Sequence, residues 1–568
     1  MKIKLLLYSI LFSFSISTLS SQNLSLDWVK QFSGSSDELV YDLEIDANGN
    51  IFTFGQFDGT VDFDPGAGVN SLTATSLFDG FVKKLDPNGD LVWVRQLTGG
   101  EFLARDIEIT ANNELIMIGS FRSSIDINLQ TAGMPLTNQG NLEVFTLILD
   151  TNGNFMSAAK YDGSDFGYGM DIAYKSSNNI RWDVGYFRDT LFNRGVPAAV
   201  AGTTATFLSS GGQMNIIAGS GQVSGTSADL STRGSLFAVG IYTHKVFPPV
   251  GMPFGDTLEA NGGLDYFIYK QHADGSPYWL KGIKGNATSI PRQIQQDPKD
   301  LSSGNRTHSL YIAGSFSDTV DFDPDTGNTS KLVSRNSSQD VFLQKLDTSG
   351  NLIWAKSFGG NRVDRLPVFD TDEFGNVYLA GIFKDTADFD PSAATANLVS
   401  TGGFDIFLLK LDSSGNFMWA VSFGGTLGDH QASGIKVVNN SIYLTGQFQD
   451  SIDFDPTTGV NSKLSQNGSL DVFVLKLTDG TVGIKEANKN DQLKLYPNPS
   501  QGMIKVDNSS GAWNRLDVLD LQGRILFSEE ALSKDIIDLQ LSDLPNGTYL
   551  MRMEGDQMST VQKFVVKK

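Results

Sequence analysis

The chain contains no cysteine, so it has no disulfide framework, no zinc–thiolate site and no cysteine nucleophile. It also lacks an excess of positive charge, since 43 Lys and Arg stand against 64 Asp and Glu and the net charge is −21. Contacts to nucleic-acid phosphates need clustered basic residues, so no nucleic-acid partner is expected. Without disulfides, the fold must be stabilised by packing and by closure of its sheets.

Familiar catalytic motifs are missing as well. The four histidines fit no metal-binding pattern such as HExxH, and no P-loop, dinucleotide fingerprint or GxSxG elbow occurs in a suitable context. Aspartates are abundant, and a glycosidase carboxylate pair could assemble from segments far apart in the chain. The sequence therefore favours a protein without catalytic activity, and no catalytic or cofactor-binding residue can be assigned from it.

Long apolar runs are also scarce, and the main one is N-terminal. MKIKLLLYSILFSFSISTLSSQ has a short basic start, an apolar stretch and a small-residue exit near Ser20 or Ser21. We expect a signal peptide at residues 1–21 and a mature chain that begins near Gln22. No other segment approaches about 20 consecutive apolar residues, so no transmembrane span is expected in the mature chain.

Glycine is plentiful, with 59 residues, and part of it belongs to an internal repeat. A glycine followed two residues later by an aromatic residue recurs about every 65 residues, at Gly55, Gly119, Gly185, Gly240, Gly314, Gly381 and Gly446. In the clearest unit, alternating apolar and polar residues predict strands at 366–371, 376–384, 405–411 and 416–423. Seven four-stranded units favour an all-β fold, a seven-bladed β-propeller, in which radial repetition leaves only short protected edges.

The two ends of the repeat array fit a ring. The array begins with an unpaired fourth-type strand, LSLDWVKQFSG, and ends with a third-type strand, DVFVLKLTDG, which has no partner following it. We therefore predict that the N-terminal strand completes the last blade by hydrogen bonding to the C-terminal one.

The strand pairs DGFVKKLDPNGDLVW, DVFLQKLDTSGNLIW and DIFLLKLDSSGNFMW resemble the SBBP-type bacterial propeller repeat. The resemblance covers roughly residues 24–480 and is weakest in the fourth unit. It implies a seven-bladed propeller at residues 22–480 and brings no catalytic residues with it.

The pattern changes after Gly480. Residues 481–492 form a polar, non-periodic stretch that indicates a linker, and residues 493–568 predict a small β-sandwich. LKLYPNPSQGMIKV, LDVLDLQGRILF, LSDLPNGTYLMRM and QKFVVKK closely resemble the type A sorting domain of the type IX secretion system of Bacteroidetes. The resemblance implies export by that machinery, with the protein secreted or held at the outer cell surface.

One hexapeptide recurs four times within the repeats, as TVDFDP, TVDFDP, TADFDP and SIDFDP. Its carboxylates are candidate Ca²⁺ ligands, because Ca²⁺ favours carboxylate oxygens. These candidates are Asp62, Asp64, Asp321, Asp323, Asp388, Asp390, Asp453 and Asp455. The favoured interpretation is structural, with the phenylalanine packed between blades and the aspartates capping turn amides.

Three functions stay open at this stage. The first is a surface-displayed binding or adhesion module that contacts a glycan or a surface protein through the variable connections opened by DFDP. The second is an extracellular polysaccharide hydrolase or lyase that uses aspartates near the central channel. The third is a structural component of the surface layer.

Overall fold

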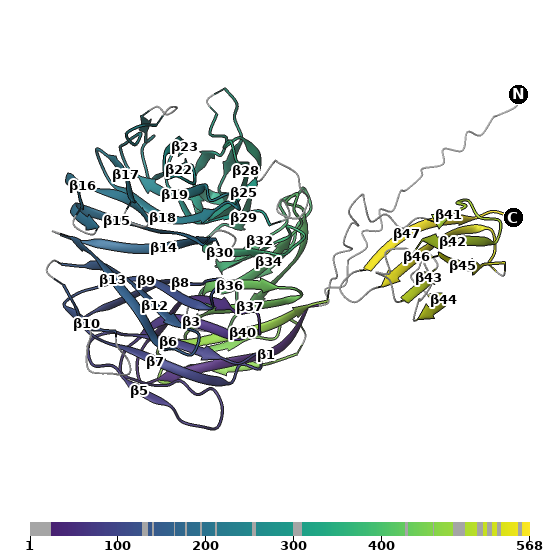
Figure 1. The fold of residues 1–568 in the computed structure, drawn as a ribbon, viewed down its shortest axis with the longest axis horizontal. Helices are drawn as coiled ribbons and strands as arrows, with labels where there is room; N and C mark the ends of the chain where they lie inside the picture. Colours follow the sequence, from purple (N-terminus) through teal and green to yellow (C-terminus); the bar gives the residue numbers. More distant parts are fainter. Residues whose placement is uncertain are drawn as a thin grey trace, which may run out of the picture.

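The computed structural model is built almost wholly of β-strands, which confirms the all-β fold class (Figure 1). It describes residues 24–127, 135–138, 141–163, 165–175, 179–193, 196–210, 213–252, 257–298, 309–325, 327–425, 430–457, 459–480, 495–507, 515–519, 525–530, 536–542, 544–554 and 559–568. The expected signal peptide (1–21) and linker (481–492) lie outside these residues. None of the described residues belongs to a helix that could cross a lipid bilayer.

Residues 24–480, here called the seven-sheet array, contain seven groups of four principal antiparallel strands, here called sheets 1 to 7, of which sheets 2 and 3 are joined edge to edge into one larger sheet. Sheets 1 to 3 are β2 (Glu38–Ile45), β3 (Ile51–Phe57), β6 (Asp79–Leu85), β7 (Leu91–Gly99); β8 (Phe102–Ile109), β9 (Glu114–Phe121), β12 (Glu143–Asp150), β13 (Phe155–Gly163); and β14 (Gly167–Lys175), β15 (Ile180–Asn193), β16 (Val196–Ser210), β17 (Gln213–Gly219).

Sheets 4 to 7 continue the same order. They are β18 (Val223–Leu230), β19 (Leu236–Tyr242), β22 (Asp265–Gln271), β23 (Pro277–Gly285); β24 (Ser289–Gln296), β25 (Ser309–Ser317), β28 (Gln339–Asp347), β29 (Leu352–Gly360); β30 (Arg365–Thr371), β31 (Val377–Phe383), β34 (Asp405–Leu411), β35 (Phe417–Phe423); and β36 (His430–Val438), β37 (Ser441–Phe448), β40 (Asp471–Asp479), β1 (Leu24–Gly34). The strands predicted in the sixth sheet agree with these bounds to within one residue.

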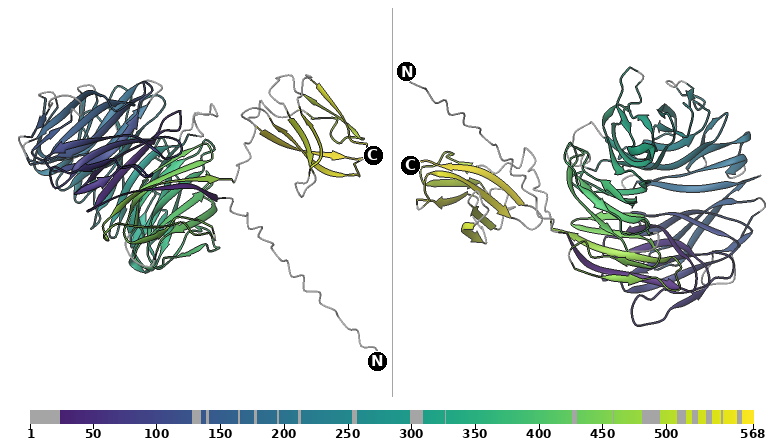
Figure 2. Two further views of the ribbon diagram at one scale, coloured as in Figure 1. Left: turned by 90° about the horizontal axis from the view of Figure 1, so that it is seen from below. Right: turned by 180° about the vertical axis from the view of Figure 1, so that it is seen from behind.

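The first strands of the sheets, called the inner strands, contact one another in a closed order. This order is β2, β8, β14, β18, β24, β30, β36 and again β2. Figures 1 and 2 show the sheets following one another around a common centre, from purple through teal to light green.

Apolar side chains between neighbouring sheets form the core. Phe54 of sheet 1 meets Phe102 of sheet 2 edge to face, with ring centroids 5.9 Å apart. Trp93, Trp279 and Trp419, which recur once per unit, are buried in these layers. Burial between sheets accounts for the apolar alternation that the strands show in sequence.

The N-terminal strand β1 pairs with β40, the last strand of the array. The pairing runs from Leu24 opposite Asp479 to Phe32 opposite Val472. Phe32 is buried at this junction. Residues at the two ends of the array are thus held together by main-chain hydrogen bonds.

The DFDP segments, and the equivalent segments at β10 and β20 that lack this sequence, form short hairpins that add strands to the outer edge of the preceding sheet. β4 (Thr60–Asp62) pairs with β1, β10 (Ser124–Asp126) with β7, β20 (Lys245–Phe247) with β17, β26 (Thr319–Asp321) with β23, and β32 (Thr386–Asp388) with β29. Their return strands are β5 (Ser71–Thr73), β11 (Pro135–Thr137), β21 (Leu258–Glu259), β27 (Lys331–Val333) and β33 (Asn397–Val399). In sheet 7, β38 (Ser451–Asp453) and β39 (Ser462–Leu464) form the same hairpin, which bridges to Gly424 of sheet 6.

Sheet 3 replaces the separate hairpin by a longer one. β15 and β16 extend past the sheet, and β15 pairs with β13 at Leu191 opposite Gly163. A 3₁₀ turn, η1 (Arg335–Ser337), lies in the corresponding connection of sheet 5.

The C-terminal residues form two further antiparallel sheets. One contains β41 (Leu495–Tyr496), β42 (Met503–Asp507) and β45 (Ile536–Gln540); the other contains β44 (Ile525–Glu530), β43 (Arg515–Leu519), β46 (Gly547–Glu554) and β47 (Ser559–Val566). Apolar residues from both sheets, including Ile504, Val518 and Phe564, pack into one core. This is the two-sheet arrangement expected of a small β-sandwich.

Candidate functional site in the central cavity

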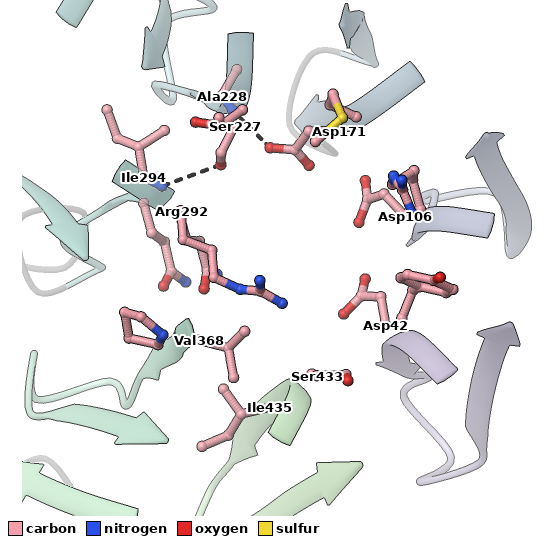
Figure 3. A pocket seen from close by; sticks show the side chains of 18 of the residues that line it. Asp42, Asp106, Asp171, Ser227, Ala228, Arg292, Ile294, Val368, Ser433 and Ile435 are labelled. Carbon is pink, nitrogen blue, oxygen red and sulfur yellow. Dashed lines mark hydrogen bonds between the residues drawn. The ribbon is translucent and has the colours of Figure 1, made fainter. Parts of the chain in front are cut away.

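The inner strands surround a cavity of about 540 Å³, to which every one of the seven sheets contributes residues. That volume lies within the usual range for small-molecule sites. The side chains that line it come from the middle of β2, β8, β14, β18, β24, β30 and β36 (Figure 3). The sequence predicts aspartates near a central channel as candidates, but none of these residues could be named from it.

Each inner strand carries a β-bulge at the level of the cavity. The register with the second strand shifts by one residue on all seven inner strands, and on β30 the two residues Leu366 and Pro367 lie opposite the single residue Gly381. The residues at the bulges are Tyr41, Arg105, Met170, Thr226, Arg292, Leu366 with Pro367, and Ser433. A bulge bends its strand and redirects side chains, and bulges are frequent beside functional sites.

The residue after each bulge forms a layer around the cavity. In chain order this layer is Asp42, Asp106, Asp171, Ser227, Gln293, Val368 and Gly434. Four of its members hydrogen-bond the next sheet: Ile172 N–H donates to Asp106 (2.7 Å), Ala228 N–H to Asp171 (2.7 Å), Ile294 N–H to Ser227 (3.2 Å) and Phe369 N–H to Gln293 (2.8 Å). The layer therefore joins sheets 2 to 6.

Gly434 has a different role in this layer. A Cβ atom at Gly434 would meet Oδ1 of Asp42 at 3.0 Å and the amide nitrogen of Leu43 at 3.1 Å. The absence of a side chain allows β36 and β2 to approach closely, which completes the cavity wall between sheets 7 and 1.

A second layer, two residues further along each strand, is richer in charge. It comprises Glu44, Glu108, Ala173, Asp229, Gln295, Asp370 and Lys436. Val437 N–H donates to Asp370 (2.7 Å), and Lys436 forms an ion pair with Glu44. These contacts link sheet 6 to sheet 7 and sheet 7 to sheet 1.

Removal from bulk water alters the protonation of these acids. Burial, together with the carboxylate of Asp171 and other acids, raises the pKa of Asp106 well above its usual range. Burial raises the pKa of Glu44 to about 7, although Lys436 opposes the shift. The carboxyl groups of Asp42 and Asp106 also hydrogen-bond each other, which requires a proton between them.

Two guanidinium groups line the same cavity. Burial and the positive charge of Arg105 lower the pKa of Arg292 to about 10. Figure 3 shows Arg292 reaching into the cavity from the side opposite Asp42 and Asp106. Among the described residues, neither arginine has an ion pair, although Arg105 donates to the carbonyl of Ala104 and lies 5.1 Å from the Tyr41 ring centroid.

The DFDP aspartates lie in separate hairpins and do not converge. In each motif the first aspartate accepts two backbone N–H groups; Asp453, for example, accepts from Asp455 (3.1 Å) and Asn461 (2.8 Å). The second accepts one or more groups of the following turn, such as Thr457 N–H on Asp455 (2.9 Å). Among the other first aspartates, Asp62 accepts from the amides of Asp64 and Asn70, Asp321 from those of Asp323 and Ser330, and Asp388 from those of Asp390 and Ala396. Among the other second aspartates, Asp64 accepts from the amide of Gly66, Asp323 from that of Asp325, and Asp390 from that of Ser392.

The phenylalanines of the motif are fully buried. Phe63, Phe322, Phe389 and Phe454 are at most 1% exposed, and each ring packs on others of the same sheet. No group of three or more His, Asp or Glu residues suited to a metal ion occurs within the described part of the chain. These contacts favour the structural interpretation of DFDP.

Comparison with known families identifies the C-terminal region. Residues 494–567 match the family of secretion system C-terminal sorting domains. The resemblance to a type IX sorting domain is thereby confirmed. The protein is handled by the type IX secretion system and is delivered to the cell surface or beyond it.

Three further matches are distant from this chain in sequence. A 120-residue stretch is 24% identical to an uncharacterized WD repeat-containing protein of Acanthamoeba polyphaga mimivirus and covers 19% of this chain and 9% of that protein. A protein of unknown function from Dyadobacter fermentans aligns over 80% of this chain and 99% of its own, at 10% identity and a TM-score of 0.35. The Plexin A4 extracellular region aligns over 94% of this chain and 62% of its own, at 9% identity and a TM-score of 0.28.

Proposed function

We propose that residues 22–480 form a closed seven-bladed β-propeller of the SBBP-type repeat, displayed at the cell surface as a ligand-binding module. The proposal includes the signal peptide at 1–21, the linker at 481–492 and the sorting domain at 493–568. The observation that carries it is the cavity, because all seven inner strands line one enclosure with polar side chains that differ from sheet to sheet. A wall needed only for stability would have no reason to vary in this way.

The proposed binding surface comprises this cavity and the connections around it. The hairpins of the outer edge are occupied by structural contacts, whereas the cavity retains guanidinium and carboxyl groups directed at its interior (Figure 3). Polar groups that converge in a concave site are the usual basis of small-ligand recognition.

The alternative of a polysaccharide hydrolase or lyase has one observation in its favour. Asp42, Asp106 and Asp171 are carboxyl groups of neighbouring sheets that share hydrogen bonds, and paired carboxyl groups perform glycoside hydrolysis. Asp106 and Asp171 already accept backbone N–H groups of sheets 3 and 4, which favours binding over turnover.

The test uses the mature chain, residues 22–568, applied to an array of immobilised glycans and to labelled polysaccharides in solution. Saturable binding without product release supports the binding module. Product release would favour the hydrolase or lyase. Absence of both would leave a structural surface-layer role and overturn the proposal.

A further inference from the structure

The two arginines of the cavity stand out because neither has an ion-pair partner within the part of the chain that the structure describes. Arg105 and Arg292 lie on inner strands β8 and β24, and the charge of one lowers the pKa of the other. Holding like charges in a partly dehydrated enclosure costs free energy unless an anion offsets them. An anion bound between them would remove that cost.

The acids of β2, β8 and β14 do not provide that anion. Asp42 and Asp106 share a proton, and Asp106 and Asp171 accept main-chain N–H groups from the next sheet. Lys436 is paired with Glu44 in the deeper layer. These charged groups are thus engaged with each other and with the backbone.

The chemistry of the wall limits what the anion can be. A guanidinium group binds a carboxylate through two parallel hydrogen bonds in one plane. A phosphate dianion would be repelled by the carboxyl groups nearby. A monoanionic carboxylate therefore matches the two guanidinium groups better than a phosphate dianion does.

The rest of the cavity suits hydroxyl groups. Asp42 and Asp171 present acceptor oxygens, Ser227 has a hydroxyl that both donates and accepts, and Gln293 has an amide. The ring of Tyr41 adds an aromatic surface. Hydroxyl groups fit this set better than an ammonium group, because the shared proton of Asp42 and Asp106 reduces the negative charge of the wall.

We propose that the cavity binds a carboxylated carbohydrate, a hexuronic acid residue, with its carboxylate between Arg105 and Arg292 and its hydroxyl groups on Asp42, Asp171 and Ser227. This inference rests on the proposed binding function and specifies its ligand class. The surface location established by the sorting domain places the cavity where extracellular acidic glycans are accessible.

The test is titration calorimetry of residues 22–568 with digalacturonate and with glucuronate, compared with galactose, cellobiose and glutamate. Saturable heat is expected for the uronates alone. Arg292→Gln should weaken uronate binding about tenfold or more, as expected for loss of a charge-assisted pair. Arg292→Lys should retain part of the affinity, because the charge remains and the planar fork is lost.

Arg362→Gln is the matched control, because Arg362 is exposed, pairs with Asp385 and does not line the cavity. Its uronate affinity should equal that of the wild type. Near-ultraviolet circular dichroism checks that each variant is folded, and Arg292→Lys keeps the test valid if Arg292→Gln is not.

Several outcomes would overturn the inference. Equal binding of galactose, tighter binding of glutamate, or unchanged uronate affinity in both Arg292 variants would each do so. Absence of uronate heat in a protein that binds another glycan on the array would refute the ligand class and leave the binding function standing. Absence of binding in the calorimetry and on the glycan array would refute the proposed binding function as well.

Discussion

At the outer edge of the seven-sheet array, four of the hairpins repeat the DFDP sequence almost unchanged. At the inner edge, equivalent positions carry Asp, Ser, Gln, Val and Gly in turn. The repeated aspartates and phenylalanines of the hairpins are engaged with turn amides and with the core. In this repeat protein, identity between units marks architecture, and divergence on a shared scaffold marks the candidate site.

Both edges depend on closure of the array by strand β1. Deletion of residues 24–34 would remove this strand. We expect a loss of more than about 5 kcal/mol in the free energy of unfolding, because Leu24, Val29 and Phe32 each contribute roughly 2 kcal/mol by burial and β40 loses its partner strand. Chemical denaturation followed by tryptophan fluorescence measures this.

Truncation after residue 480 serves as the control for that deletion. The seven sheets should then unfold at an unchanged denaturant midpoint. An unaltered midpoint after loss of residues 24–34 would show that the sheets are stable without strand β1.

Three substitutions in one DFDP hairpin test whether the motif is structural, because each should lower the free energy of unfolding by a different amount. Phe454→Ala should cost about 3–5 kcal/mol, as expected for removal of a fully buried ring. Asp453→Ala should cost about 1–3 kcal/mol, because two backbone N–H groups lose their acceptor. Asp455→Ala should cost less, since its partners in the following turn are exposed to water. An inverted order, with Asp455 most sensitive, would contradict the structural interpretation.

At the inner edge, the same logic applies to the contacts between sheets. Asp171→Ala removes the acceptor of Ala228 N–H, whereas Ile172 N–H keeps Asp106 as an acceptor, and the change should cost about 1–3 kcal/mol in stability. Asp171→Asn retains an acceptor oxygen and should cost less. Equal stability of both variants and the wild type would show that this layer is not needed to join sheets 3 and 4.

The sequence predicted the strands well for a physical reason. Alternating apolar residues and Asp–Gly turns are local signals, and Gly375 and Gly415 indeed take the left-handed backbone conformation (φ 75° and 79°) that such turns require. The pairing of β1 with β40 could also be inferred, because the array has one spare strand at its start and lacks one strand at its end.

The cavity could not be predicted in the same way. A bulge inserts one residue and reverses the alternation that follows it, so Asp106 and Glu108 face the cavity although a regular strand pattern would not assign them there. One signal was available, namely the Asp that recurs in YDLEI, RDIEI and MDIAY at Asp42, Asp106 and Asp171. The docking of the DFDP hairpins on the preceding sheet was also missed, because such pairing is not encoded locally.

Both edges contain buried acids, and this predicts how stability depends on pH. Burial raises the pKa of Asp340 and Asp364 to about 7 and that of Asp405 and Asp471 to about 6, and Glu44 on the inner wall also reaches about 7. Since the folded state holds more protons than the unfolded state between about pH 4 and 7, stability should fall as pH rises through this window. Thermal unfolding at pH 5 and pH 8 tests this. A higher melting temperature at pH 8 would contradict it.

The smallest expected effect concerns calcium at the DFDP hairpins. The Oδ1 atoms of both aspartates in each motif already accept turn amides, and each hairpin offers only two carboxylates, whereas Ca²⁺ usually takes six to eight oxygen ligands. Titration of Ca²⁺ into metal-stripped protein is therefore expected to give no saturable heat, in the wild type and in a variant with Asp→Asn at all eight positions. Heat that the wild type shows and the variant loses would make DFDP a metal motif, and identity between units would then mark function at the outer edge as well.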